Sequence, residues 1–215
     1  MQRRRVMLAA GKQSELPPGY TRLEYISNPN GGYINPDILW HKGDIITFKF
    51  LATSAPGNRT LVSYRWKGNY KQPYQCIIST GVSNARLILI GKGLDGTHSE
   101  SAFQLNVENT LVIDSNSNVV TLNGNIAPYP YSTALGTIFD DSGSSVLIPW
   151  LFAPSGMPTV EIGTVFYIYE YSIQHGGVYA AKMLPCINPD GTYGMYDTAR
   201  KRFFGSANGK TFEGG

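Results

Sequence analysis

The sequence is poor in charge, in cysteine and in long apolar runs. Charged residues make up 15% of the 215 residues, against about 25% in an average soluble domain. The formal net charge is only +3, too small to indicate a field that binds nucleic acid. Two cysteines, Cys76 and Cys186, cannot build a disulfide framework. No apolar run approaches the roughly 18 residues of a membrane span. From the low charge we expect no nucleic-acid binding, and from the short apolar runs we expect no membrane insertion.

The chain begins with a basic segment. Arg3, Arg4 and Arg5 precede an apolar stretch over residues 6–10, which is shorter than the roughly 7–15 residues of a signal-peptide core. Leu16-Pro17-Pro18-Gly19 follows and stops any helix, since proline and glycine both disfavour it. We therefore expect no export signal, and we divide the chain into a basic N-terminal arm, residues 1–15, and one domain, residues 16–215.

The domain is a series of short segments of β type. The clearest is Asp44–Ala52, in which Ile46, Phe48 and Phe50 alternate with polar residues, as expected for a strand with one buried face. Turn residues separate the other candidate strands, and 114–118 indicates a hairpin loop. These candidates are Thr60–Trp66, Gln75–Thr80, Ala85–Ile90, Thr110–Asp114, Val119–Leu122, Val146–Phe152 and Thr164–Ile173.

Helical periodicity is absent from the sequence. No segment sustains apolar residues at i, i+3 and i+4, and Val178–Leu184 has room for no more than a short helical turn between Gly176-Gly177 and Pro185. Thr164–Ile173 is apolar on both faces, which is typical of a central strand covered on both sides. About ten short strands at this spacing predict an all-β sandwich or barrel.

Two motifs stand near the ends of the chain. The first is Leu16-Pro17-Pro18-Gly19-Tyr20-Thr21-Arg22-Leu23-Glu24-Tyr25-Ile26, continued by Gly32-Tyr33-Ile34-Asn35-Pro36. The second comprises Leu184-Pro185-Cys186, Asp190-Gly191, Gly194-Met195-Tyr196-Asp197, Phe203-Phe204 and the terminal Phe212-Glu213-Gly214-Gly215. Together they resemble the opening and closing segments of a family of bacteriophage and prophage structural proteins from phages of gut bacteria. The resemblance implies a concanavalin A-like, laminin-G-like jelly-roll β-sandwich in which the N-terminal and C-terminal strands pair.

The residues of these motifs also have a structural interpretation of their own. Leu23, Tyr25 and Ile34 suit buried positions on a strand, and Met195 and Tyr196 suit packing against a sheet. Gly191 and Gly194 suit tight turns, because glycine tolerates a positive φ. Cys186 is expected to be a buried thiol.

Catalytic and metal-binding patterns are missing from the sequence. Hydrolases on concanavalin-like folds carry carboxylates at alternate positions of one strand, and the nearest acidic pair, Asp140-Asp141, lies in a Ser/Gly-rich loop. His41, His98 and His175 lack the spacing of a zinc site. Residues 205–211 imitate a phosphate-binding loop but leave no room for the helix that it requires. We therefore expect no catalytic residues, no metal and no cofactor.

Aromatic side chains are the remaining candidates for binding. Sugar sites place aromatic rings against the apolar face of a pyranose and fix its hydroxyls with polar groups. The segment over Trp66, Lys67, Asn69 and Tyr70 combines these types and is the predicted carbohydrate site. The alternative is that Trp40, Trp66 and Trp150 belong to the core.

The resemblance to phage structural proteins, together with the missing catalytic patterns, implies a non-enzymatic structural protein of a phage virion, such as a capsid decoration, head fibre or tail-associated subunit. We expect it to be made in the bacterial cytoplasm and to act in the virion, by association with copies of itself and with a capsid or tail protein. Arg3, Arg4 and Arg5 are the predicted assembly arm. A lectin-like module that binds host-surface glycans is the alternative, and a glycan hydrolase is a weaker one.

Overall fold

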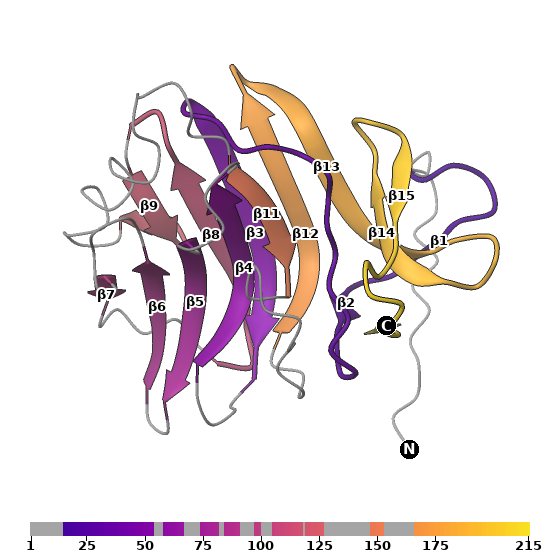
Figure 1. The fold of residues 1–215 in the computed structure, drawn as a ribbon, viewed down its shortest axis with the longest axis horizontal. Helices are drawn as coiled ribbons and strands as arrows, with labels where there is room; N and C mark the ends of the chain where they lie inside the picture. The colour runs from indigo at the N-terminus through magenta and orange to yellow at the C-terminus, as the bar shows by residue number, and fades with distance from the viewer. Residues whose placement is uncertain are drawn as a thin grey trace.

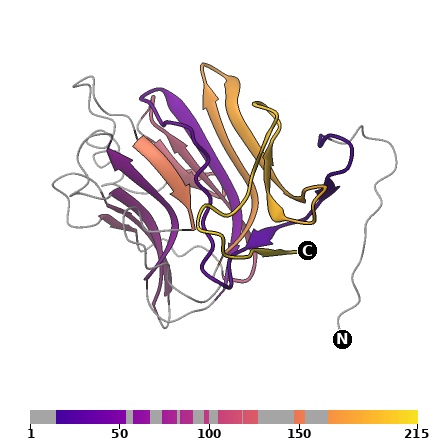
Figure 2. The ribbon, with the colours of Figure 1, turned by 45° about the vertical axis from the view of Figure 1, so that its right-hand side comes forward.

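Every regular element in the described part of the chain is a β-strand. The computed structural model describes residues 15–53, 58–66, 74–81, 84–90, 97–99, 105–117, 119–126, 147–152 and 166–215, with backbone alone for 58–66, 74–81, 84–90, 97–99 and 147–150. Two antiparallel sheets lie as two layers in Figures 1 and 2. Within these residues, no helix is long and apolar enough to cross a membrane. The prediction of an all-β protein is confirmed.

The larger sheet has eleven strands, and eight of them follow the order β10-β9-β8-β3-β12-β13-β14-β15. Their bounds are β3 Asp44–Ala52, β8 Glu108–Asp114, β9 Val119–Leu122, β10 Asn125–Ile126, β12 Phe166–His175, β13 Val178–Ile187, β14 Tyr193–Asp197 and β15 Arg202–Phe204. The other three are β1 Thr21–Arg22, β2 Ile26–Ser27 and β16 Glu213–Gly214. β12 lies in the middle of this sheet, as its apolar sequence predicted.

The smaller sheet has five strands in the order β11-β4-β5-β6-β7. Its strands are β4 Asn58–Trp66, β5 Tyr74–Gly81, β6 Asn84–Ile90, β7 Thr97–Ser99 and β11 Leu147–Leu151. An isolated bridge between Ile34 and Leu151 ties the segment before β3 to this second layer.

Strands form at all the segments predicted as strands, but the expectation of a helical turn was wrong. Val178–Leu184 is not a turn of helix; it belongs to the ten-residue strand β13. β13 pairs with β12 on one side and β14 on the other, so sheet pairing decides its conformation. Pro185 has no N–H to donate, but its carbonyl still accepts a hydrogen bond from the Leu23 N–H at 3.0 Å.

The two ends of the chain meet in the larger sheet, as the resemblance implied. β1 pairs with β13, and β2 pairs with both β12 and β16. The Glu24 N–H donates a hydrogen bond to the Gly215 carbonyl. Leu23 and Ile34 are buried as predicted, whereas Tyr25 is half-buried. The pairing explains why two motifs at opposite ends of the chain form one structural unit.

The main core covers the inner face of the larger sheet. Along β3, buried residues alternate with half-buried ones, so Ile46, Phe48 and Phe50 share one face as predicted. Trp40 and Tyr171 lie in the same cluster, and the Trp40 indole N–H donates a hydrogen bond to the Tyr171 hydroxyl at 2.7 Å. Both polar groups are thereby satisfied without water. For Trp40, the core alternative is correct.

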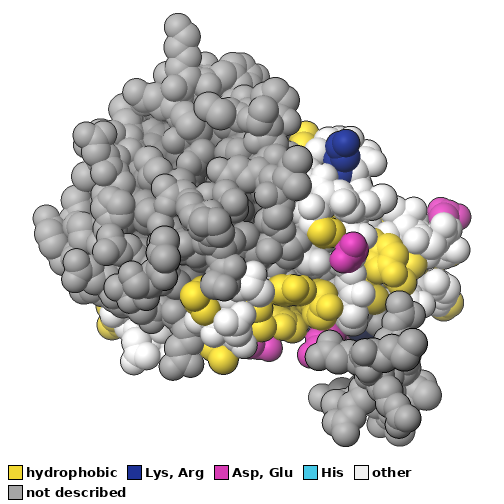
Figure 3. Space-filling model, turned by 90° about the horizontal axis from the view of Figure 1, so that it is seen from below, with side chains coloured by type: hydrophobic (Ala, Val, Ile, Leu, Met, Phe, Trp, Pro, Cys, Tyr) yellow, Lys and Arg dark blue, Asp and Glu magenta, His cyan; other side chains and the backbone are white. Residues whose placement is uncertain are grey.

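The outer face of the larger sheet is partly covered by the segment that precedes β1. Leu16 packs there with Leu184, Cys186 and Tyr196, and Tyr20 adds to this second cluster. Tyr20 and Tyr196 make an edge-to-face contact with ring centroids 5.0 Å apart. Beyond this cover, half-buried side chains and exposed carboxylates remain on the surface. Seen from below, the described surface in Figure 3 carries hydrophobic side chains with a few acidic ones among them.

Gly191 and Gly194 are required for different reasons, one for its backbone conformation and the other for the space around it. Gly191 has a φ of 81° and lies in a turn, as predicted. Gly194 lies inside β14, so the turn predicted for it was wrong. A Cβ added there would meet the Phe204 carbonyl oxygen and would lie 2.5 Å from Phe203 Cζ. Close approach of β15, and not backbone conformation, requires glycine at this position.

We predict that Gly194→Ala destabilises the domain by about 1–3 kcal/mol, because overpacking forces β14 and β15 apart. Gly205→Ala is the matched control: its new Cβ would lie 3.5 Å from Phe203 Cε1, an ordinary contact. Urea unfolding followed by circular dichroism compares the two variants. Equal midpoints would contradict the role assigned to Gly194.

We also predict that Cys186 resists alkylation. It is fully buried, and burial raises the pKa of its thiol to about 11, so at pH 8 the reactive thiolate is scarce. In a Cys76→Ser background, iodoacetamide at pH 8 should leave Cys186 unmodified until urea unfolds the protein. Mass spectrometry of the peptides measures this, and rapid labelling of the native protein would show the prediction to be wrong.

Candidate functional site

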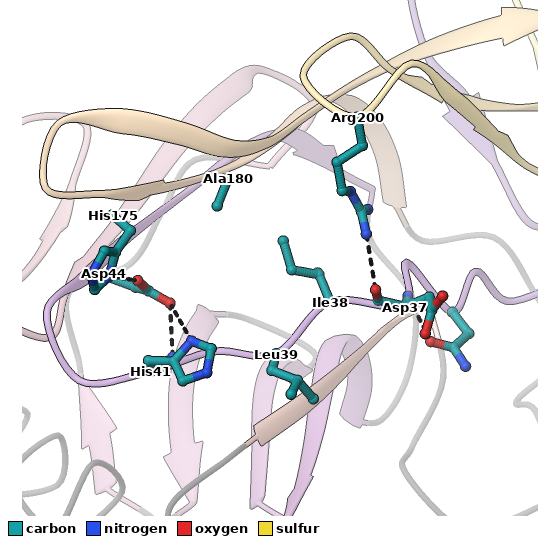
Figure 4. A pocket seen from close by; sticks show the side chains of 9 residues that line it. Asp37, Ile38, Leu39, His41, Asp44, His175, Ala180 and Arg200 are labelled. Carbon is teal, nitrogen blue, oxygen red and sulfur yellow. Dashed lines mark hydrogen bonds and ion pairs between the residues drawn. The ribbon is translucent and has the colours of Figure 1, made fainter.

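A cleft of about 890 Å³ opens beside the inner face of the larger sheet. Three segments form it: residues 35–44, which end at the start of β3, the hairpin between β12 and β13, and the turn between β14 and β15. In Figure 4, Asp44, His41 and His175 lie on one side and Asp37 and Arg200 on the other. Ile38, Leu39 and Ala180 lie between them and give the cleft an aliphatic wall.

Asp44 organises the histidine side of the cleft. Its carboxylate is buried, with 2% of the side chain exposed. Asp44 Oδ1 lies 2.9 Å from His175 Nδ1, and Oδ2 accepts a hydrogen bond from the His41 backbone N–H at 2.7 Å. The sequence allows this geometry because Gly43, with a φ of 93°, turns the chain into β3, where Asp44 stands opposite His175 of β12.

The two imidazoles are accessible to a ligand. The side chains of His175 and His41 are 66% and 53% exposed. Since an ionised carboxylate only accepts hydrogen bonds, the contact with Asp44 assigns the proton of His175 to Nδ1 and leaves Nε2 for a ligand. A register shift after Ile173 in the pairing of β12 with β13 lies beside this hairpin, and such bulges re-aim side chains next to sites.

Arg200 holds the opposite wall in place. Its guanidinium donates to the Pro36 carbonyl at 2.7 Å and to the Asp37 carbonyl at 2.9 Å. Arg200 Nε also donates to Asp197 Oδ2 at 2.6 Å, and the side chain of Asp197 is fully buried. Three backbone N–H groups, those of Lys182, Ala199 and Arg200, donate to the other oxygen of Asp197. Charge assistance strengthens each of these bonds.

Asp37 adopts an uncommon backbone conformation at this wall. Its φ is 48°, in the left-handed region that asparagine and aspartate enter more readily than other non-glycine residues. Asn35 Oδ1 accepts the Asp37 N–H at 3.0 Å, and Arg202 Nη1 donates to Asp37 Oδ2 at 3.0 Å. The Asn35 amide NH2 and the second Asp37 carboxylate oxygen have no partner in the described part of the chain, so both can meet a ligand.

The chemistry of the cleft is that of hydrogen bonding. Both carboxylates are already engaged, that of Asp44 by His41 and His175 and that of Asp37 by Arg202. Among the residues that the structure describes, no group of three His, Cys, Asp or Glu side chains has the arrangement of a metal site. The cleft can therefore offer imidazole, amide and carboxylate groups around an aliphatic wall.

Most residues of the sites predicted from the sequence fall outside the described part of the chain. Arg3, Arg4 and Arg5, and Lys67, Asn69 and Tyr70 of the predicted carbohydrate segment, are outside the described residues. Trp66 is the last residue of β4, opposite Leu147, and its side chain is not described. Sequence reasoning missed the cleft because it searched the histidines for local spacing. The signal is in the pairing of β3 with β12, which brings Asp44 to His175.

Comparison with known proteins assigns no family. No family model matches the chain, and none of the curated proteins matches its sequence. Among solved structures, a double-cysteine variant of alginate lyase A1-II′ is 14% identical with a TM-score of 0.44, and the match covers 66% of each chain.

Two further similar structures are phage tailspike proteins. Full-length tailspike protein 2 of a bacteriophage of Escherichia coli O157:H7 is 12% identical with a TM-score of 0.42, over 78% of this chain and 27% of that chain. The enzymatically active domain of bacteriophage CBA120 tailspike protein 2 is 11% identical with a TM-score of 0.41, over 78% and 30%. The chain thus spans less than a third of each tailspike. TM-scores below 0.5 assign neither a fold family nor an activity.

We predict that Arg200→Lys destabilises the domain by about 1–3 kcal/mol, because lysine cannot make the forked bonds to Pro36 and Asp37 while also reaching Asp197. Arg202→Lys is the matched control, since its ion pair with Asp37 is 61% and 68% exposed and such pairs contribute below about 1 kcal/mol. Thermal and urea unfolding measure both. A smaller loss for Arg200→Lys than for Arg202→Lys would contradict the clamp.

Proposed function

We propose that the chain is a non-enzymatic subunit of a phage virion, on a concanavalin A-like jelly-roll fold, that binds a glycan in the cleft lined by His41, His175, Asn35 and Asp37. The observation that carries the glycan proposal is the cleft itself. It combines an aliphatic wall with imidazole, amide and carboxylate groups at its two ends.

A sugar ring fits this arrangement chemically. Its hydroxyls need donors and acceptors at fixed positions, and its C–H faces need an apolar surface. Asn35 and Asp37 supply an amide and a carboxylate at one end, while His175 Nε2 lies at the other. A volume of about 890 Å³ lies within the roughly 300–1,000 Å³ of small-molecule sites, which suits one or a few sugar units.

The hydrogen bonding of the carboxylates favours binding over hydrolysis. A glycosidase needs one carboxyl group that gives up a proton and a second that acts as nucleophile or base. In this cleft, Asp44 is buried between His41 and His175, and Asp37 is bonded to Arg202. Asp37, with its second oxygen open, is thus the one described carboxylate of the cleft that could take part, which falls short of the pair that a glycosidase needs and is the reason we propose a binding role.

The virion part of the proposal has separate support. The motifs at the two ends of the sequence resemble those of phage structural proteins, and the structure pairs these ends in one sheet. A structural subunit needs no catalytic centre and assembles through surfaces and extended segments. Head, tail and fibre positions are all compatible with this role.

We predict that a glycan array identifies at least one ligand and that His175→Ala and Asn35→Ala each weaken its binding about ten-fold, the effect of losing one or two hydrogen bonds. Val178→Ala is the matched control, since Val178 lies on the same hairpin, is 72% exposed and is outside the cleft. Calorimetric titration gives the affinities, and circular dichroism checks that the variants fold.

Two outcomes would contradict the proposal. Release of products from any polysaccharide on the array would make the chain an enzyme, and equal binding by His175→Ala and Val178→Ala would place the ligand outside the cleft.

Mass spectrometry and immunogold labelling of purified particles test the virion role separately. A fixed copy number is expected, and absence from particles would leave a free lectin-like module as the better interpretation.

A further inference from the structure

The outer face of the larger sheet carries a group of three tyrosines at the end away from the cleft. Tyr167 and Tyr169 come from the start of β12, and Tyr25 comes from the segment before β2. The Tyr25 ring lies 4.7 Å from that of Tyr167 and 6.1 Å from that of Tyr169, both nearly edge-to-face. All three are half-buried, so part of each ring faces solvent. We call this group the tyrosine patch.

A bulge exposes part of the tyrosine patch. The pairing of β12 with β3 shifts register between Ile168 and Glu170, so Tyr169 has no partner on β3. Phe166 and Ile168 on either side of Tyr167 are buried in the core. Tyr167 therefore points to the outer face, on the opposite side of the sheet from the cleft.

Exposed carboxylates surround the tyrosine patch. Strand register places Glu108, Leu51, Tyr167, Ser27 and Glu213 in one row across five strands. Glu108 and Glu213 thus lie on either side of Tyr167, and Glu24 precedes Tyr25. All three glutamates are exposed, and no cation in the described part of the chain forms an ion pair with them.

The titration of the tyrosines agrees with this negative field. Burial is the largest cause that raises the pKa values of Tyr25 and Tyr169. Glu24 raises both, with Glu213 acting on Tyr25 and Glu108 on Tyr169. The cations of this face are already engaged: Lys49 is 3.3 Å from Glu170, and Arg22 donates to the Pro185 carbonyl. The surface is therefore acidic and aromatic together, which suits an arginine-rich ligand.

The chain itself contains a segment of matching chemistry. Residues 1–14 carry four cations, Arg3, Arg4, Arg5 and Lys12, and no acidic residue. The described chain starts at Glu15, whose carboxylate pairs with Lys182, and Arg22 interacts electrostatically with both Glu15 and Glu170. From Glu15 back to Arg4, an extended chain spans up to roughly 36 Å, so the arginines can reach the patch of the same or of a neighbouring subunit.

We propose that the tyrosine patch, with Glu24, Glu108 and Glu213, is the docking site of residues 1–14 of the basic N-terminal arm, which carry its arginines. Arginine planes stack on the tyrosine rings while their N–H groups bond to the surrounding carboxylates. A neutral glycan would use the rings but would gain nothing from three carboxylates, which is why the charge favours the arm. The inference rests on the proposed assembly role and names the receptor surface for it.

The test is a binding experiment with the full-length chain. The acceptor is the Arg3→Gln/Arg4→Gln/Arg5→Gln variant, which leaves the patch open, and the probe is a fluorescent peptide of residues 1–14 with a blocked N-terminus. Fluorescence anisotropy should show binding that weakens as salt rises. In the acceptor, Glu24→Gln/Glu213→Gln should weaken binding about ten-fold, and Tyr169→Leu, which keeps an apolar side chain, about three-fold.

Asp114→Asn in the same acceptor is the matched control. Asp114 lies at the opposite end of β8 from Glu108, and its replacement removes one negative charge without touching the patch. Binding should therefore stay unchanged. Equal binding by the Glu24→Gln/Glu213→Gln acceptor and the control, or no binding at all, would overturn the proposal. The proposal would also be overturned if the peptide did not bind and Tyr169→Leu lost glycan binding, because the tyrosine patch would then be a carbohydrate-binding site.

Sedimentation velocity of the wild-type chain then shows whose patch the arm occupies. Association at low salt that both the arginine and the glutamate variants abolish indicates docking on a neighbour. A monomer that binds the peptide only after its own arginines are replaced indicates docking within one chain. Both outcomes support the proposal, and neither depends on virions or glycans, so failure here is distinguishable from failure of the proposed function.

Discussion

The buried carboxylate of Asp197 is the interaction on which the rest of the described structure depends. A charged group without exposed surface is stable in a protein only when hydrogen bonds replace its water. Three backbone N–H groups and the Arg200 guanidinium do so. Since Arg200 also binds two carbonyls of the segment before β3, the same carboxylate fixes the turn between β14 and β15 and the segment that enters the core sheet.

The N-terminal and C-terminal regions together form both candidate sites. The segment from 28 to 41 crosses the inner face of the larger sheet and forms a wall of the cleft, while residues 16–25 follow its outer face and supply Tyr25. Residues of the C-terminal region hold both segments. Arg200 bonds to the Pro36 carbonyl on the inner side, and the Pro185 carbonyl accepts the Leu23 N–H on the outer side. The candidate glycan site and the tyrosine patch therefore both depend on the pairing of the terminal motifs.

Much of the fold could be predicted from local pattern, and the site could not. Alternation identified β3 to the residue, because one buried face imposes a period of two on Ile46, Phe48 and Phe50. The same reasoning failed for Val178–Leu184, where pairing with two neighbours outweighed the glycines and the proline. It also failed for Gly194, where glycine is required because the Phe204 backbone lies too close for a Cβ. His41 meets Asp44 within a local turn, but His175 reaches Asp44 through the pairing of β12 with β3 over a long sequence separation, which local spacing does not encode.

Two bulges in β12 explain why one strand serves two sites. The register shift against β3 after Ile168 leaves Tyr169 on the outer surface, and the shift against β13 after Ile173 lies beside His175 at the rim of the cleft. Between them, Tyr171 remains buried and bonded to Trp40, which anchors the strand. Because bulges change the facing of side chains without breaking the sheet, the cleft and the tyrosine patch lie on opposite faces and at opposite ends of β12. A ligand at one site would therefore leave the other accessible, so the proposed docking of the arm and the proposed glycan binding are compatible in one subunit.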